Sequence, residues 1–231
     1  MASCPAKAAA LAEARAERPT GLEGELLGRR ELGLRADPEY VRDLQDRYAA
    51  GQFPHGSAPV GRGGERDWST SWGVLMTAEE EDGLWNREHA LRPLIDAATA
   101  YLAGLPSRQV GGVWLALGEN GIVVSLTAAA DVRAVLTDLR ALAGPGQSVR
   151  AVQVRWSTVE LRVIEHKALA RIGKVGNHHA IDVTSGVVSI MVPDGVRAVA
   201  QAVAEVVDPC AVHVSRGQFV YTPLRRQPRR G

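Results

Sequence analysis

The chain has 231 residues, of which 45% are hydrophobic and 23% charged, values ordinary for a globular protein of one large or two small domains. The net charge of +1 excludes a global electrostatic field that would attract nucleic acid or an anionic membrane. No apolar run is long enough for a membrane span, and no secretory signal is recognisable, so we expect the chain as written to be cytoplasmic.

The first 66 residues have the composition of an N-terminal arm and linker. Alanine and charged residues from Lys7 to Arg18 predict a solvent-facing helix that ends at Pro19. A second helix is predicted over Pro38–Ala50, with Asp37 as its N-cap. Its apolar face is thin, and a stretch rich in glycine and proline follows it. We therefore expect residues 1–66 to be a helical, partly flexible arm that packs loosely.

A long helix is predicted next. Thr77 and Glu80 have the spacing of a capping box, in which each side chain accepts a hydrogen bond from the backbone of the other residue. Pro93 falls inside the helical pattern and predicts a kink or a break near Arg92. The apolar residues at helical spacing are Leu84, Leu91, Leu94, Ile95, Ala98 and Leu102.

The segment up to residue 157 then predicts a ββαβ unit. Two apolar runs flank the turn at residues 118–121, which contains Asn-Gly, a strong hairpin signal. A helix follows from Asp131 to Ala143, and the alternating segment Val149–Trp156 predicts a strand. Residues 67–157 thus comprise the long helix and the first unit.

The same order of elements is predicted for residues 158–223. A helix after Ser157 leads to a hairpin centred on residues 184–186, a helix over 195–207 and a strand over Ala211–Ser215. Residues 224–231 are predicted to be a basic, disordered tail.

A sequence repeat supports the duplication. The segment Val123–Leu136 recurs 64 positions later as Val187–Ala200, and seven of fourteen aligned residues are identical. The apolar positions of the two helices correspond, so both copies are expected to bury the same face. The sequence therefore predicts an α+β protein with two ββαβ units, each a small antiparallel sheet packed by a helix.

Residues with reactive side chains do not form a recognisable site. His178 and His179 are adjacent in a predicted strand and point to opposite faces, so they cannot easily bind one metal ion. Glu165 and His166 could transfer protons, but they have no evident nucleophile beside them. Cys4 and Cys210 are expected to be free thiols, the only two cysteines of the chain. We expect no catalytic residues, no metal and no cofactor.

The central region resembles the N-terminal, non-catalytic part of actinobacterial trypsin-like serine peptidases of the S1 family. The matching residues are Gly73-Val74-Leu75, Thr77-Ala78-Glu79-Glu80, Tyr101-Leu102-Ala103, Gly111-Gly112-Val113-Trp114, Val123-Val124-Ser125-Leu126-Thr127, the segment 152–162 and Phe219-Val220-Tyr221-Thr222-Pro223. Such ββαβ modules resemble protease pro-regions, which assist folding of the protease and inhibit it. The resemblance implies a serine protease as partner, a role in trans or a vestigial one, and secretion if the N-terminus is misassigned.

Two functions remain open from the sequence. The first is a non-catalytic protein-binding module that uses a sheet surface or edge. The second is a nucleic-acid-binding module, since aromatic residues on a sheet can stack bases and the tail is rich in arginine. An enzyme that uses His166 or the His178–His179 pair is a third and weaker possibility. The residues expected to contact a partner are Trp114, Trp156, Phe219, Tyr221, Arg225 and Arg226.

Overall fold

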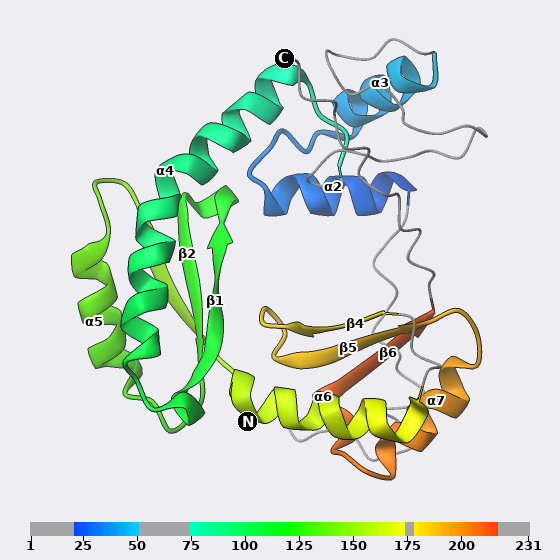
Figure 1. The fold of residues 1–231 in the computed structure, drawn as a ribbon. Coiled ribbons are helices and arrows are strands. Elements are labelled where there is room, and N and C mark those ends of the chain that lie inside the picture. Colours follow the sequence, from blue (N-terminus) through cyan, green and yellow to red (C-terminus); the bar gives the residue numbers. More distant parts are fainter. Residues whose placement is uncertain (1–20, 51–73, 174–177, 217–231) are drawn as a thin grey trace, which may run out of the picture. The chain divides into compact units, whose positions relative to one another are not determined.

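The structure, a computed structural model, describes residues 21–50, 74–173 and 178–216. These residues form an α+β fold with six α-helices and two three-stranded sheets (Figure 1), which confirms the fold class expected from the sequence. They divide into two compact units. The first contains residues 21–50, 74–159 and 183–186, and the second contains 160–173, 178–182 and 187–216.

The sheet of the first unit is mixed. Strand β1 (Val110–Ala116) pairs antiparallel with β2 (Gly121–Leu126), whereas β2 pairs parallel with β3 (Ser148–Gln153). Helix α5 (Val132–Leu142) connects β2 to β3 and returns the chain in the direction of β2. The expectation of antiparallel sheets is therefore wrong for the third strand, because a helical crossover brings the chain back parallel to the strand it left.

Helix α4 (Ala78–Ala103) begins at the capping box that the sequence predicts. The amide of Glu80 donates to Thr77 Oγ1 at 3.2 Å, and the amide of Thr77 donates to Glu80 Oε2 at 3.0 Å. The helix continues through Pro93, so of the predicted kink or break the break is not found, and Figure 1 shows that the helix bends part-way along its length. Pro93 lies on the exposed side, and the neighbouring leucines are buried in the core. Their burial offsets the backbone hydrogen bond that proline cannot donate.

Helices α4 and α5 cover one face of the first sheet (Figure 1). The sheet contributes Ile122, Val124 and Leu126, all fully buried, to the same hydrophobic core. The helices contribute Leu84, Leu91, Leu94, Ala98, Leu102, Val135 and Leu139. This core accounts for the helical spacing of apolar residues in the sequence.

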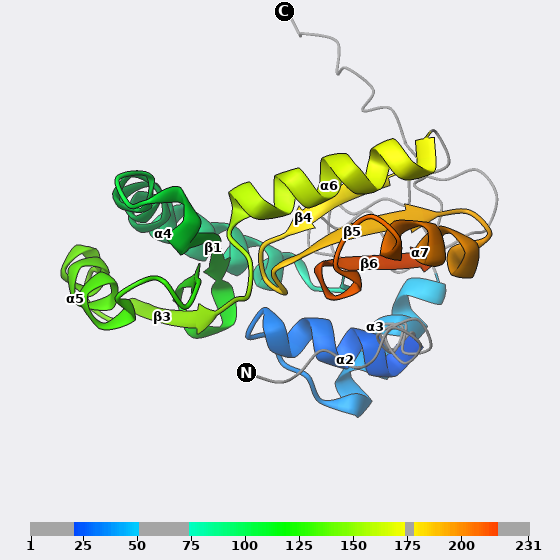
Figure 2. The same ribbon diagram turned by 90° about the horizontal axis from the view of Figure 1, so that it is seen from below.

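The second unit repeats this topology. Strand β4 (His178–Asp182) pairs antiparallel with β5 (Val187–Val192), and β5 pairs parallel with β6 (Val212–Arg216). Helices α6 (Thr158–Ile172) and α7 (Val196–Ala204) lie beside this sheet (Figure 2). The residues that correspond in the repeat are buried in both copies: Val124 and Val188, Leu126 and Ile190, Val135 and Val199, Leu139 and Val203.

One prediction about the second unit is wrong. Cys210 lies in the short helix η4 (Pro209–Ala211) before β6. It forms a disulfide bond and is not the free thiol that the sequence analysis expected. Cys4 lies outside the described residues, as does the helix predicted from Lys7 to Arg18.

The described part of the N-terminal arm is helical and packed. Helix α3 (Pro38–Ala49) has the predicted N-cap, since the amide of Tyr40 donates to Asp37 Oδ1 at 3.0 Å. Helix α2 (Gly21–Glu31) was not predicted. Loose packing is wrong for residues 21–49, because Arg29 and Val41 are completely buried.

Arg29 fixes α2 to the start of α4. Its Nε donates to the carbonyl of Arg35 at 2.6 Å, its Nη1 to the carbonyl of Leu75, and its Nη2 to a carboxylate oxygen of Glu80. The guanidinium also lies 5.2 Å from the centre of the Tyr40 ring. Because Glu80 completes the capping box of α4 as well, one carboxylate joins the two helices.

We predict that Arg29→Met lowers the free energy of unfolding by about 3 kcal/mol, because it leaves buried carbonyls and the Glu80 carboxylate without their donor. Urea denaturation measures this change. The control is Arg47→Met on α3, whose ion pair with Asp43 is exposed and should contribute less than about 1 kcal/mol. Equal effects of the two substitutions would show that Arg29 does not hold α2 in place.

A close backbone contact holds the segment that follows α2. Gly33 has a φ of 67°, and a Cβ on it would lie 2.7 Å from the Cα of Gly118 in η2 (Leu117–Glu119), the turn between β1 and β2. Arg87 of α4 donates from Nη1 to the carbonyl of Leu32 at 3.2 Å and to that of Leu117 at 3.1 Å. The end of α2 is therefore fixed against the turn of the first sheet.

Gly33→Ala should destabilise the protein by about 2–4 kcal/mol, the sum of a left-handed φ for alanine and an overpacked backbone contact. Gly146→Ala is the matched control, since Gly146 also has a positive φ, 73°, but nothing lies within 4 Å of its Cβ position. The control should lose about 1 kcal/mol only. Thermal and urea unfolding of the two variants test the difference, and equal losses would exclude the close contact.

Candidate functional site

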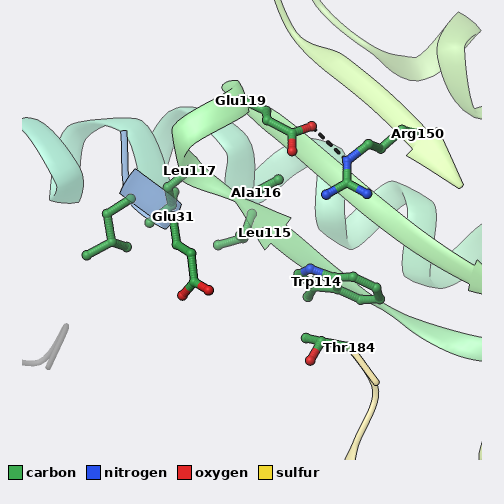
Figure 3. A pocket seen from close by; sticks show the side chains of 9 residues that line it. Glu31, Trp114, Leu115, Ala116, Leu117, Glu119, Arg150 and Thr184 are labelled. Carbon is green, nitrogen blue, oxygen red and sulfur yellow. Dashed lines mark hydrogen bonds and ion pairs between the residues drawn. The ribbon is translucent and has the colours of Figure 1, made fainter. Parts of the chain in front are cut away.

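A pocket of about 510 Å³ lies beside the first sheet (Figure 3). The end of α2, strand β1, the turn η2 and strand β3 supply most of its lining. The lining residues are Glu31, Leu32, Trp114, Leu115, Ala116, Leu117, Glu119, Arg150 and Thr184, and we call this the Trp114 pocket.

Strand alternation places Trp114 in the pocket. Val113 and Leu115, its neighbours in β1, pack partly against the core beneath α4, so Trp114 projects from the opposite face. Trp114 is paired with Val123 of β2, and Val123 with Arg150 of β3. The indole and the guanidinium thus belong to one row across the sheet, and Trp114 is only partly buried.

The charged groups of the pocket are two carboxylates and one guanidinium. Arg150 Nε donates to Glu119 Oε2 at 2.7 Å, and the two side chains are 47% and 49% exposed. An ion pair this exposed contributes little to stability and can exchange partners. Glu31 adds a second carboxylate from the end of α2.

The sequence identified one residue of this pocket. Trp114 lines it, whereas Trp156 is absent from the lining and lies under the Arg155 guanidinium, 4.6 Å from its ring centre. Phe219, Tyr221, Arg225 and Arg226 lie outside the described residues.

Glu31, Glu119 and Arg150 were missed. The alternation of the strand Val149–Trp156 could have placed Arg150 on the face opposite the core. No sequence signal indicates that Glu31 lies near this strand, because only the packing of α2 brings it there.

A second cluster of titratable groups is buried under α2. Glu25 Oε1 accepts a hydrogen bond from the amide of Leu75 at 2.5 Å, and the residue is 7% exposed. Burial raises the pKa of Glu25 above its ordinary value, although the Leu75 amide and the charge of Arg29 oppose this. The cluster therefore joins α2 to the segment before α4.

The second unit contains one pairing of reactive side chains that the sequence did not predict. His179 Nδ1 of β4 lies 2.9 Å from Glu165 Oε1 of α6, and the histidine is 43% exposed. His166 is exposed, as expected for its position off the apolar stripe. Within the ranges that the structure covers, no three His, Cys, Asp or Glu side chains are grouped to bind a metal ion. The His179–Glu165 contact is a hydrogen bond on the surface of this unit.

Comparison with known protein families and with curated proteins gives no match for this chain. Among the described residues, no helix has both the length and the apolar character needed to span a bilayer. The Trp114 pocket thus has to be interpreted from its own geometry.

The raised pKa of Glu25 has a consequence for stability. A carboxyl group with a higher pKa in the folded than in the unfolded state binds more protons when folded. Stability conferred by this group therefore falls as pH rises from about 4.5 through the raised pKa.

We predict that Glu25→Gln removes this loss of stability at higher pH. The glutamine keeps a side-chain oxygen that can accept the hydrogen bond from the Leu75 amide. The natural chain should become less stable relative to the variant as pH rises above about 4.5 and through the raised pKa of Glu25, measured by urea unfolding at each pH. Glu79→Gln, at an exposed position of α4, is the control and should leave the pH profile unchanged. A constant difference between the natural chain and Glu25→Gln would contradict the prediction.

Proposed function

We propose that this chain is a non-catalytic protein-binding module that takes up a segment of a partner protein in the Trp114 pocket. The observation that supports this is a partly buried indole set among apolar and charged side chains in a depression of about 510 Å³. Tryptophan is enriched at the centres of protein interfaces, since one ring buries a large area while few torsions are fixed.

The resemblance to protease pro-regions favours a serine protease as the partner. In that version the chain assists the folding of a separate trypsin-like protease or inhibits it. Nucleic acid is the less favoured ligand, because the guanidinium that lines the Trp114 pocket, Arg150, is already paired with the Glu119 carboxylate, and that carboxylate would repel phosphate.

Selection from a display library of random peptides tests the proposal. We expect enriched peptides to bind the natural chain at least about tenfold more tightly than the Trp114→Ala variant, because a central aromatic residue contributes more than about 1.4 kcal/mol. Trp85→Ala, at an exposed position of α4, is the matched control and should bind as the natural chain does. Peptides that bind equally well without the Trp114 indole would contradict the proposal.

The protease version needs its own measurement. A trypsin-like protease whose nucleophilic serine is replaced by alanine serves as the probe, so that this arginine-rich chain is not cleaved. We expect binding in calorimetry that weakens with Trp114→Ala. Absence of binding removes the protease as partner and leaves the peptide selection to identify another.

A further inference from the structure

We infer that the partner segment is bound as an extended strand that pairs with the outer edge of β1. This rests on the proposed protein-binding function and adds how the segment is recognised, through its backbone as well as through the Trp114 indole. The edge of a sheet offers a row of unpaired N–H and C=O groups, and an extended peptide can pair with them.

The Trp114 pocket reaches the edge of β1. Four successive residues, 114–117, line it, and Figure 3 shows them in succession along the pocket. Successive side chains of a strand point to opposite faces, so a depression confined to one face would be lined mainly by every second residue. The exposure of β1 does not alternate either: each residue from 112 to 116 is partly buried, whereas every residue of the central strand β2 is buried. The pocket therefore extends over the edge of β1 that β2 does not occupy.

The pairing of β2 fixes the direction of the backbone groups of β1. In an extended strand, the N–H and C=O of one residue point to one neighbouring strand, and those of the next residue point to the other. The carbonyl of Leu126 accepts from the amide of Val154, directly after β3, at 2.9 Å. The amide of Thr127 donates to the carbonyl of Gln109, directly before β1, at 2.9 Å. Val123 and the other odd-numbered residues of β2 therefore bond toward β1.

Val113 and Leu115 consequently point their backbone groups away from β2. Trp114 is the partner of Val123 and bonds toward it, so its two neighbours in β1 face the outer edge. Among the described residues, β1 pairs with β2 alone, and no hydrogen bond is made to the backbone groups of Val113 or Leu115. An extended chain presents complementary donors and acceptors at the same two-residue spacing.

The composition of β1 also distinguishes it from the other strands at a sheet edge. Natural proteins commonly protect such strands with charged side chains, which oppose pairing with another chain. The sequence of β1, VGGVWLA, contains no charged residue. The other edge strands that the structure describes each contain one: Arg150 in β3, Asp182 in β4 and Arg216 in β6. The edge of β1 is thus the one most open to an added strand.

The boundaries of this edge favour a separate segment over the β1 strand of a second copy. At one boundary, the carbonyl of Gly111 already accepts from Thr158 Oγ1 at 2.6 Å. At the other, Glu31 and Leu32 of the α2 end line the pocket. The β1 strand of a second copy is itself flanked by α2 and would bring that helix up to the same edge. A short extended segment brings no such helix.

The Trp114 indole selects the side chain at one position of the bound segment. Residues directly opposite each other on neighbouring strands have their side chains on the same face. In antiparallel pairing, which is the more stable arrangement per residue, the residue opposite Trp114 forms a non-hydrogen-bonded pair, in which side chains lie closest. Leu32 and Leu117 also line the pocket and offer apolar contact. We therefore expect an aromatic or β-branched residue at this central position, with backbone hydrogen bonds made by its two neighbours.

An N-methyl scan of an enriched peptide from the display selection tests the added strand. Methylation of one amide removes a backbone donor and leaves the side chain in place. We expect the methyl group to weaken binding at least about tenfold on either neighbour of the central residue, and less than about threefold on the central residue itself. Replacement of single side chains by alanine should give the opposite pattern, with the largest loss at the central residue. Calorimetry measures both series.

Amide hydrogen exchange of the ¹⁵N-labelled chain, followed by NMR, gives the matching measurement on β1. Without peptide, the amides of Val113 and Leu115 should exchange faster than those of Trp114 and Ala116, which bond toward β2. Peptide should slow exchange at Val113 and Leu115 at least about tenfold and change it less at Trp114 and Ala116.

The same measurement without peptide identifies other occupants of the edge. Protection of Val113 and Leu115 that rises with protein concentration would show that β1 pairs with a second copy. Protection at every concentration would show that another segment of this chain covers the edge. Either result would overturn the inference.

The two experiments separate this inference from the proposed function. Equal losses at all positions of the N-methyl scan, or bound peptide that protects neither Val113 nor Leu115, overturn the added strand. The protein-binding function still stands in that case, because the peptide was selected and requires Trp114. If no selected peptide requires Trp114, the proposed function is itself wrong, and the added strand with it.

Discussion

The completely buried guanidinium of Arg29 is the interaction on which the first unit depends. A buried positive charge is costly unless every donor has an acceptor. Here the carbonyls of Arg35 and Leu75 and the carboxylate of Glu80 supply those acceptors, and they come from three separate segments. The cost of leaving any of them unpaired fixes the position of α2, of the segment before α4 and of the first turn of α4 together.

The Trp114 pocket is a consequence of that arrangement. One wall of the pocket, Glu31 and Leu32, belongs to the end of α2 and exists only where α2 is docked. The Gly33–Gly118 contact and the Arg87 hydrogen bonds then set the distance between this wall and β1. A polar network buried away from the pocket thereby shapes a surface that contacts solvent.

The parts of the fold that sequence predicts are those with local or periodic signals. The capping box at Thr77, the helix after Asp37 and the duplicated apolar faces all follow from residues a few positions apart. Helix α2 escapes such reasoning because the residues it buries are Glu25 and Arg29, which no hydrophobic pattern identifies. The same reason explains the pocket: Trp114 is recognisable in its strand, whereas Glu31 reaches it only through tertiary packing. The mixed sheets could have been foreseen, because a crossover helix returns the chain parallel.

The duplication produces two similar cores but not two similar surfaces. Trp114, Val123 and Arg150 form one row across the first sheet. The corresponding row of the second sheet contains Asp182, which pairs with Val187, and Ala211, the residue before the Val188–Val212 pair on β6. The second row therefore has neither an indole nor a guanidinium. A partner that requires Trp114 would bind with a stoichiometry of one per chain. In the second copy of the repeat, only the buried valines of the core would be under selection, and the surface residues of this row would not.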